Sequence, residues 1–176
     1  PDNSPALAML AILLGEEYLR GLSDSGTLAL EARKLANRAA AVKPDSVLSH
    51  LALSVSAYAL NEPKIAIREA ELAIKANAPG NLATLGLAAC TIGLCGEWER
   101  GVSLLRSLQS QLATYPCWHH EIECVDFYLR GDYPSAMAVA ERFTLDQWPG
   151  KALCLALIFA ELGDFRQARG HLEQLK

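Results

Sequence analysis

The chain repeats one short stretch, GDYPSA at residues 131–136, at a nearly constant interval. Related stretches are GDFRQA at 163–168, GEWERG at 96–101 and NEPKIA at 61–66. Their first residues, at positions 61, 96, 131 and 163, lie 35, 35 and 32 positions apart. A fixed period of this length is typical of stacked repeat proteins. The stretch therefore predicts a turn that recurs along the chain and decides its fold.

The first two positions of the stretch have residue types that end one helix and cap the next. Gly or Asn at the first position reaches the left-handed conformation that ends a helix. These residues are Asn61, Gly96, Gly131 and Gly163. The acidic residue that follows can cap the next helix, because its carboxylate accepts from free N–H groups and favours the positive end of the helix dipole. We therefore expect each stretch to be the turn of a helical hairpin.

The third and sixth positions are predicted to set how the two helices of each hairpin pack. The third is aromatic in three copies (Trp98, Tyr133 and Phe165) and is expected to fold back over the preceding helix end. The sixth residue is small, so that two helices can touch, and a larger side chain there would overpack the crossing by roughly 1–3 kcal/mol. The small residues are Ala66, Gly101, Ala136 and Ala168.

Apolar periodicity, breakers and prolines divide the rest of the chain into ten predicted helices. Their expected ranges are 4–21, 27–42, 46–60, 63–77, 81–94, 98–114, 117–130, 134–146, 151–162 and 165–175. No stretch alternates with the period of a strand. We expect an all-α fold of five antiparallel hairpins, at about 4–44, 45–79, 80–116, 117–148 and 149–176, stacked into one repeat domain over residues 1–176.

Composition narrows the classes of partner. The chain has 176 residues, 51% apolar and 20% charged, with a net charge of −4. Its Lys and Arg residues are scattered, which argues against nucleic-acid binding. The longest uncharged apolar run, residues 6–14, is shorter than the ~20 residues that span a bilayer, so no membrane insertion is expected.

The five cysteines have no CxxC spacing and lie mostly in apolar runs, which indicates reduced, buried thiols in a cytoplasmic protein. The sequence begins at Pro1 without Met, so we expect a piece of a longer protein.

The hairpin pattern resembles the tetratricopeptide (TPR) repeat family. Members of that family have two helices in about 34 residues, small residues on both helices, an aromatic after the turn and a closing proline. Matching sets are Ala32, Ala39 and Pro44, then Ala66, Ala73 and Pro79, then Ala136, Ala140 and Pro149. The Trp that the family favours early in the first helix is absent, and His50, Leu85 and His120 stand near that place. The resemblance implies a right-handed α-solenoid.

A narrower resemblance concerns the runs at 39–46, 96–101, 115–119 and 128–133. They are similar to the TPR tails of bacterial class III adenylate cyclase-like proteins and winged-helix transcriptional regulators. That resemblance implies a regulatory or docking segment whose catalytic or DNA-binding domain lies outside residues 1–176.

One cluster suggests chemistry of its own. Cys117, His120 and Cys124 lie on one helical face, and thiolate and imidazole ligands at this spacing suit zinc or a nucleophilic pair. However, this face is expected to pack inside the hairpin, and no fourth ligand or oxyanion-stabilising loop is evident. We therefore predict no enzyme activity, metal or cofactor, and a metal-binding or enzymatic protein remains an alternative.

The resemblance to TPR proteins implies a concave groove lined by the first helix of each hairpin. Aligned on the small turn residue, its predicted lining is Leu48, Leu51, Val55, Tyr58, Gly86, Cys90, Trp118, Glu121, Val125, Tyr128, Leu153 and Leu157. Relatives that bind chaperone tails clamp a carboxylate with Lys, Arg and Asn, whereas this set has no basic residue and contains Glu121.

The sequence therefore predicts a non-catalytic scaffold that binds an apolar peptide, helix or neighbouring domain in this groove. The alternative from another class is a homodimerisation module of a larger bacterial signalling or transcription regulator.

Overall fold

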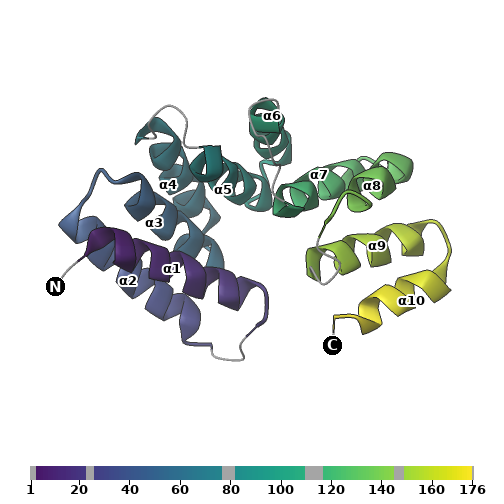
Figure 1. Ribbon diagram of the computed structural model, residues 1–176, viewed down its shortest axis with the longest axis horizontal. Helices are drawn as coiled ribbons and strands as arrows, with labels where there is room; N and C mark the ends of the chain where they lie inside the picture. Colours follow the sequence, from purple (N-terminus) through teal and green to yellow (C-terminus); the bar gives the residue numbers. More distant parts are fainter. Residues whose placement is uncertain (1–2, 23–25, 77–81, 110–116, 145–148, 176) are drawn as a thin grey trace. The chain divides into compact units, whose positions relative to one another are not determined.

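The computed structural model describes residues 3–22, 26–76, 82–109, 117–144 and 149–175, and every regular element in these ranges is a helix. The ten helices are α1 (Ser4–Leu19), α2 (Leu28–Val42), α3 (Val47–Ala59), α4 (Pro63–Ala76), α5 (Leu82–Leu94), α6 (Trp98–Gln109), α7 (Cys117–Leu129), α8 (Tyr133–Ala140), α9 (Pro149–Glu161) and α10 (Phe165–Glu173) (Figure 1). The all-α class is confirmed, and most helix ends fall within two residues of the prediction. The ends and boundaries predicted at 77, 79, 81, 114, 116, 146 and 148 lie outside the described residues.

The chain divides into two compact units. Unit 1, residues 1–111, contains α1 to α6, and unit 2, residues 112–176, contains α7 to α10. Within each unit consecutive helices pair, and the first helix of a later hairpin contacts both helices of the hairpin before it. Thus α3 contacts α1 and α2, α5 contacts α3 and α4, and α9 contacts α7 and α8. One continuous array over all five hairpins stays a prediction.

The predicted turn residues all adopt the left-handed conformation. Their φ values are +58° at Asn61, +104° at Gly96, +75° at Gly131 and +80° at Gly163. Each turn closes with the same two backbone hydrogen bonds: at Gly96, for example, its N–H donates to the Gly93 carbonyl and the next N–H donates to that of Ile92. These two hydrogen bonds satisfy carbonyl groups that have no partner within the helix at its end.

A fifth turn of this kind, which the hexad comparison missed, ends α1. Gly21 has φ +64°, its N–H donates to the Tyr18 carbonyl, and Leu22 donates to that of Glu17. The residues after Gly21 do not repeat the hexad, because a longer connection precedes α2. The turn chemistry is therefore common to hairpins whose loops differ in length.

Of the other hexad positions, the second is confirmed as a cap in the last two turns, and the third differs between those two turns. Carboxylates of Asp132 and Asp164 accept from the backbone N–H groups of Ser135 and Gln167, at 3.2 and 3.1 Å, and so cap α8 and α10 as predicted. The Tyr133 ring folds back onto α7 and contacts Tyr128, with 5.8 Å between ring centroids. The ring at the equivalent place in the last turn, Phe165, is exposed instead.

The small sixth residues lie where paired helices cross. Ala66, Ala136 and Ala168 are buried. A Cβ at Gly101 of α6 would lie 2.7 Å from the Gly93 Cα of α5, so here the two backbones touch. The prediction that these positions exclude larger side chains therefore has a direct steric basis.

Helix α8 is shorter than the predicted 134–146. Beyond Ala140 the backbone bonds tighten, since Arg142 donates to the Val139 carbonyl and Phe143 to that of Ala140. This turn carries the Phe143 side chain into the interior of unit 2, where its ring centroid lies 5.9 Å from that of His120. The chain therefore leaves the α-helical path after Ala140, and the Phe143 ring is buried there.

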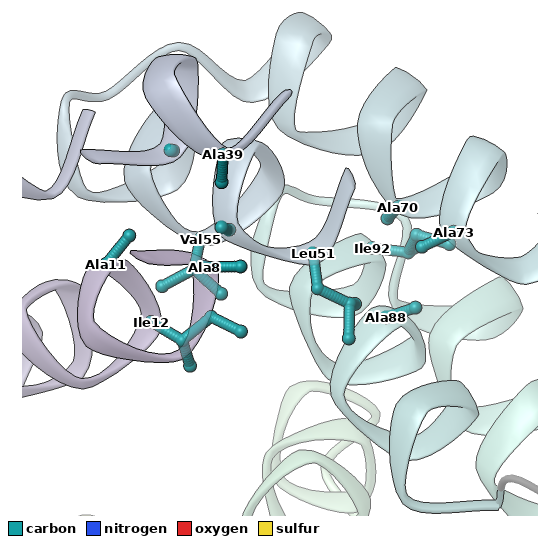
Figure 2. Close-up of a cluster of buried hydrophobic side chains, with 12 residues drawn as sticks. Ala8, Ala11, Ile12, Ala39, Leu51, Val55, Ala70, Ala73, Ala88 and Ile92 are labelled. Carbon is teal, nitrogen blue, oxygen red and sulfur yellow. The ribbon is translucent and has the colours of Figure 1, made fainter. Parts of the chain in front are cut away.

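Small residues dominate the core of unit 1 (Figure 2). Ala8, Ala11 and Ile12 of α1 face Val55 of α3, while Leu51 of α3 lies toward Ala88 and Ile92 of α5 and toward alanines of α4. Alanine lets helices approach closely but buries little apolar area per residue. The unit therefore depends on many close contacts rather than a few large side chains.

None of the helices in the described ranges combines the length and the hydrophobicity needed to cross a bilayer.

Candidate partner-binding surface

The predicted groove residues of unit 2 come from two helices that contact each other, α7 and α9. On α9, Leu153 and Leu157 lie one turn apart and are 44% and 37% exposed. On α7, Glu121, Val125 and Tyr128 share one face and are partly buried. We call these five residues the α7–α9 surface. It presents two leucines, one valine and one tyrosine with a single carboxylate.

A hydrogen-bonded cluster fixes one end of this surface. The hydroxyl groups of Tyr128 and Tyr133 donate to the Glu161 carboxylate, at 3.1 and 3.3 Å. Loss of hydration and then the bond to Glu161 raise the pKa of Tyr128, so its hydroxyl remains a donor at neutral pH. Because Tyr128 belongs to α7 and Glu161 to α9, this bond ties the two helices together where the surface ends.

The structure corrects the groove prediction for four residues of unit 1, since Leu51, Val55, Gly86 and Cys90 are all buried. Leu51 and Val55 are buried in the core rather than exposed in a groove. Leu51 lies toward Ala88 and Ile92 of α5 (Figure 2), whereas Val55 is buried by the close approach of α1, since a Cβ at Gly15 would lie 2.8 Å from Cγ1 of Val55. The signal for this approach was in the sequence: Ala8, Ala11 and Gly15 form a small-residue stripe along α1.

The remaining predicted lining residues vary in accessibility. Gly86 and Cys90 of α5 are buried, whereas Leu48 and Tyr58 of α3 are partly buried. Trp118 belongs to α7, but its side chain lies outside the described part of the structure. Among the described lining residues, the two that are exposed, Leu153 and Leu157, therefore lie in unit 2.

Helix α7 also buries polar groups whose importance the sequence did not reveal. His119, His120, Glu123 and Asp126 are all buried. Nδ1 of His120 lies 3.6 Å from Oε2 of Glu123, and Asp126 forms an ion pair with Arg130 at 2.9 Å. Burial and then the neighbouring His120 charge lower the pKa of His119 to about 4. At neutral pH His119 is thus an uncharged interior residue.

His120 and Cys124 of the predicted cluster are buried inside their hairpin, as expected. The Cys124 thiol donates to the Ala136 carbonyl at 3.4 Å and takes part in a hydrogen bond with Cys154 of α9. That bond, followed by burial and the charge of Glu121, raises the pKa of the Cys154 thiol. The Cys154 thiol is therefore held in the protonated form, which is neither a nucleophile nor a metal ligand.

The side chain of Cys117, the third member of that cluster, lies outside the described residues. Within the residues that are described, no three His, Cys, Asp or Glu side chains are arranged to hold a metal ion.

Comparison with known proteins adds no assignment: no protein-family model matches the sequence, and no curated protein matches it.

Proposed function

We propose that this chain is a non-catalytic protein-interaction module of the TPR type, with its hairpins stacked as a right-handed solenoid. The proposal rests on the repeated geometry within each unit, where a left-handed residue ends one helix and a small residue lies at the next crossing. It also rests on the way α3, α5 and α9 each contact both helices of the preceding hairpin. Stacked hairpins of this kind bind partners along extended surfaces rather than in enclosed catalytic sites.

The α7–α9 surface is the proposed binding site, and the exposure of Leu153 and Leu157 is the observation that carries this assignment. When the repeats are aligned, Leu153 and Leu157 correspond to Leu51 and Val55 of α3, which are buried in the core. They lie on the same repeat face, but here both side chains are exposed. Exposed apolar side chains held on rigid helices are suitable anchors for a partner.

The chemistry of the surface favours an apolar helical ligand over an acidic tail. Glu121 is its only charged member, so a bound carboxylate would be repelled and would lack a charge-assisted bond. An amphipathic helix with leucines at successive turns can instead pack against Leu153, Leu157 and Val125. The expected partner is a helix of another protein or of a neighbouring domain.

Calorimetry with two peptides tests this assignment. One probe is an amphipathic helical peptide with leucines at i, i+3, i+4 and i+7, and the other ends in an acidic free carboxylate. We expect binding of the first only, weakened at least about tenfold by Leu153→Glu or Leu157→Glu, because the new carboxylate loses hydration on binding.

Leu172→Glu on α10 is the matched control, since the same change is made at an exposed leucine outside the surface. It should leave the affinity unchanged. Tight, salt-sensitive binding of the acidic peptide would contradict the assignment.

A further inference from the structure

Carboxylates lie at both ends of the α7–α9 surface. At one end is Glu161, the last residue of α9, which accepts hydrogen bonds from Tyr128 and Tyr133. At the other end is Glu121, in the first half of α7, whose charge raises the pKa of the Cys154 thiol in α9. These contacts join matching ends of α7 and α9, so the two helices run in the same direction. The apolar residues of the surface therefore lie between two acids.

The Glu161 carboxylate is held in place by donors that carry no charge. The hydroxyl groups of Tyr128 and Tyr133 each donate to a different oxygen of this carboxylate, at 3.1 and 3.3 Å. In the described part of the chain these are the only side chains that bond to Glu161. A carboxylate can accept about four hydrogen bonds, so acceptor positions remain on this exposed residue. Glu161 therefore offers a fixed negative charge to a ligand.

The two helices of the surface carry few basic side chains. Lys151 is the only Lys or Arg within Cys117–Leu129 and Pro149–Glu161, and its ammonium group donates to the Phe143 carbonyl at 3.3 Å. Residues 112–176 as a whole hold nine Asp or Glu and six Lys or Arg, which is a net charge of −3. The electrostatic potential of unit 2 therefore attracts a cationic ligand and repels an anionic one.

We propose, on the basis of the function proposed above, that the partner is a helix with a Lys or Arg at each end of its leucine pair, and that Glu121 and Glu161 bind these two cations. Glu121 lies seven residues before Tyr128, the partner of Glu161, so the carboxylates are separated by about 10 Å along the helix axes. Residues seven positions apart on a ligand helix have the same separation and share one face. The expected ligand pattern is basic at positions 1 and 8 and leucine at positions 4 and 5.

This pattern gives the ligand a register that leucines alone do not fix. A helix with leucines at every turn can shift by one turn along the surface and still pack against Leu153 and Leu157. Two carboxylates at fixed positions favour the single register in which both cations are paired. Lys and Arg suit these end positions, because their apolar stems can pack on the leucines while the charged groups stay hydrated.

Calorimetry with three helical peptides that differ only at two positions tests the proposal. Each peptide has leucine at positions 4 and 5, and positions 1 and 8 are both Lys, both Gln or both Glu. At low salt we expect the Lys peptide to bind about fivefold more tightly than the Gln peptide, because exposed charge pairs contribute modestly. The Glu peptide should bind more weakly than either, and added salt should reduce these differences.

Substitution of each acid tests where the cations bind. Glu161→Gln removes the charge but keeps an amide oxygen that can still accept from the two tyrosines. It should lower the preference for the Lys peptide over the Gln peptide about twofold or more, and so should Glu121→Gln. Glu141→Gln is the matched control, because Glu141 is an exposed residue of unit 2 outside the surface. It should leave the preference unchanged.

The possible failures of the two proposals can be told apart. Equal binding of the Lys and Gln peptides, or a preference for Lys that persists in both Glu121→Gln and Glu161→Gln, would overturn the cation sites and leave the proposed function standing. Absence of binding by every peptide, including the one with four leucines, would overturn the proposed function and the cation sites together.

Discussion

The two units use the same turn but treat an equivalent histidine differently. His50 in unit 1 and His120 in unit 2 each lie sixteen positions before the small residue of their turn, Ala66 or Ala136. Nδ1 of His50 lies 2.8 Å from Oε2 of Glu69, three residues after Ala66. The residue three after Ala136 is the apolar Val139, so His120 has no carboxylate there.

His120 instead contacts the Phe143 ring and approaches Glu123 of its own helix. A single position on the second helix therefore decides whether the histidine pairs across the hairpin or within its own helix. The contrast teaches that the hexad fixes the geometry of the hairpin, while residues outside it fix the interior chemistry of each unit.

The largest expected effect concerns the small residue at the helix crossing, which both units share. Ala66→Leu in unit 1 and Ala136→Leu in unit 2 should each lower the free energy of unfolding by roughly 1–3 kcal/mol, because both alanines are fully buried at helix crossings. Denaturant unfolding of each variant measures the change. Ala138→Leu is the matched control, since Ala138 is an exposed residue of the same helix as Ala136. If Ala138→Leu proved the more damaging change, the crossing would be misassigned.

A smaller effect is expected at Gly101, the hexad residue that is glycine where α5 and α6 cross. Gly101→Ala should destabilise by about 1–2 kcal/mol net, because contact with the Gly93 backbone outweighs the better helix propensity of alanine. Gly170→Ala in α10 has open space around the new Cβ and should stabilise by up to about 1 kcal/mol. Thermal melts should show shifts of opposite sign. Two shifts of the same sign would refute the close approach of α5 and α6.

A third expected effect depends on pH and separates the units. The pKa of His119 is near 6.5 when unfolded and about 4 when folded, so between these values the unfolded state binds more protons. Unit 2 should therefore lose stability as the pH falls from about 6.5 to about 4. Hydrogen exchange that resolves residues 117–144 from residues 26–76 can measure this loss.

His119→Asn should flatten that pH dependence in unit 2, whatever its effect on stability at neutral pH. The matched change His50→Asn in unit 1 should not flatten it. An unchanged slope in the His119→Asn protein would show that another group is responsible.

The sequence by itself determined the turns and the helices. Left-handed glycines, capping aspartates and small crossing residues act over a few neighbouring positions, so their spacing was enough to predict four turns and ten helices. It also predicted that His120 and Cys124 face the inside of their hairpin. These features depend on local backbone preferences and on helical period, both of which can be read from the order of residues.

Only the tertiary structure decided which faces remain accessible. Val55 and Leu157 have equivalent places in the repeat, yet Val55 is buried because Gly15 lets α1 approach, whereas Leu157 is 37% exposed. Likewise α8 ends early because the turn after Ala140 buries Phe143 beside His120. Exposure and pKa depend on how closely other helices approach, and that distance is set by side chains far away in the sequence.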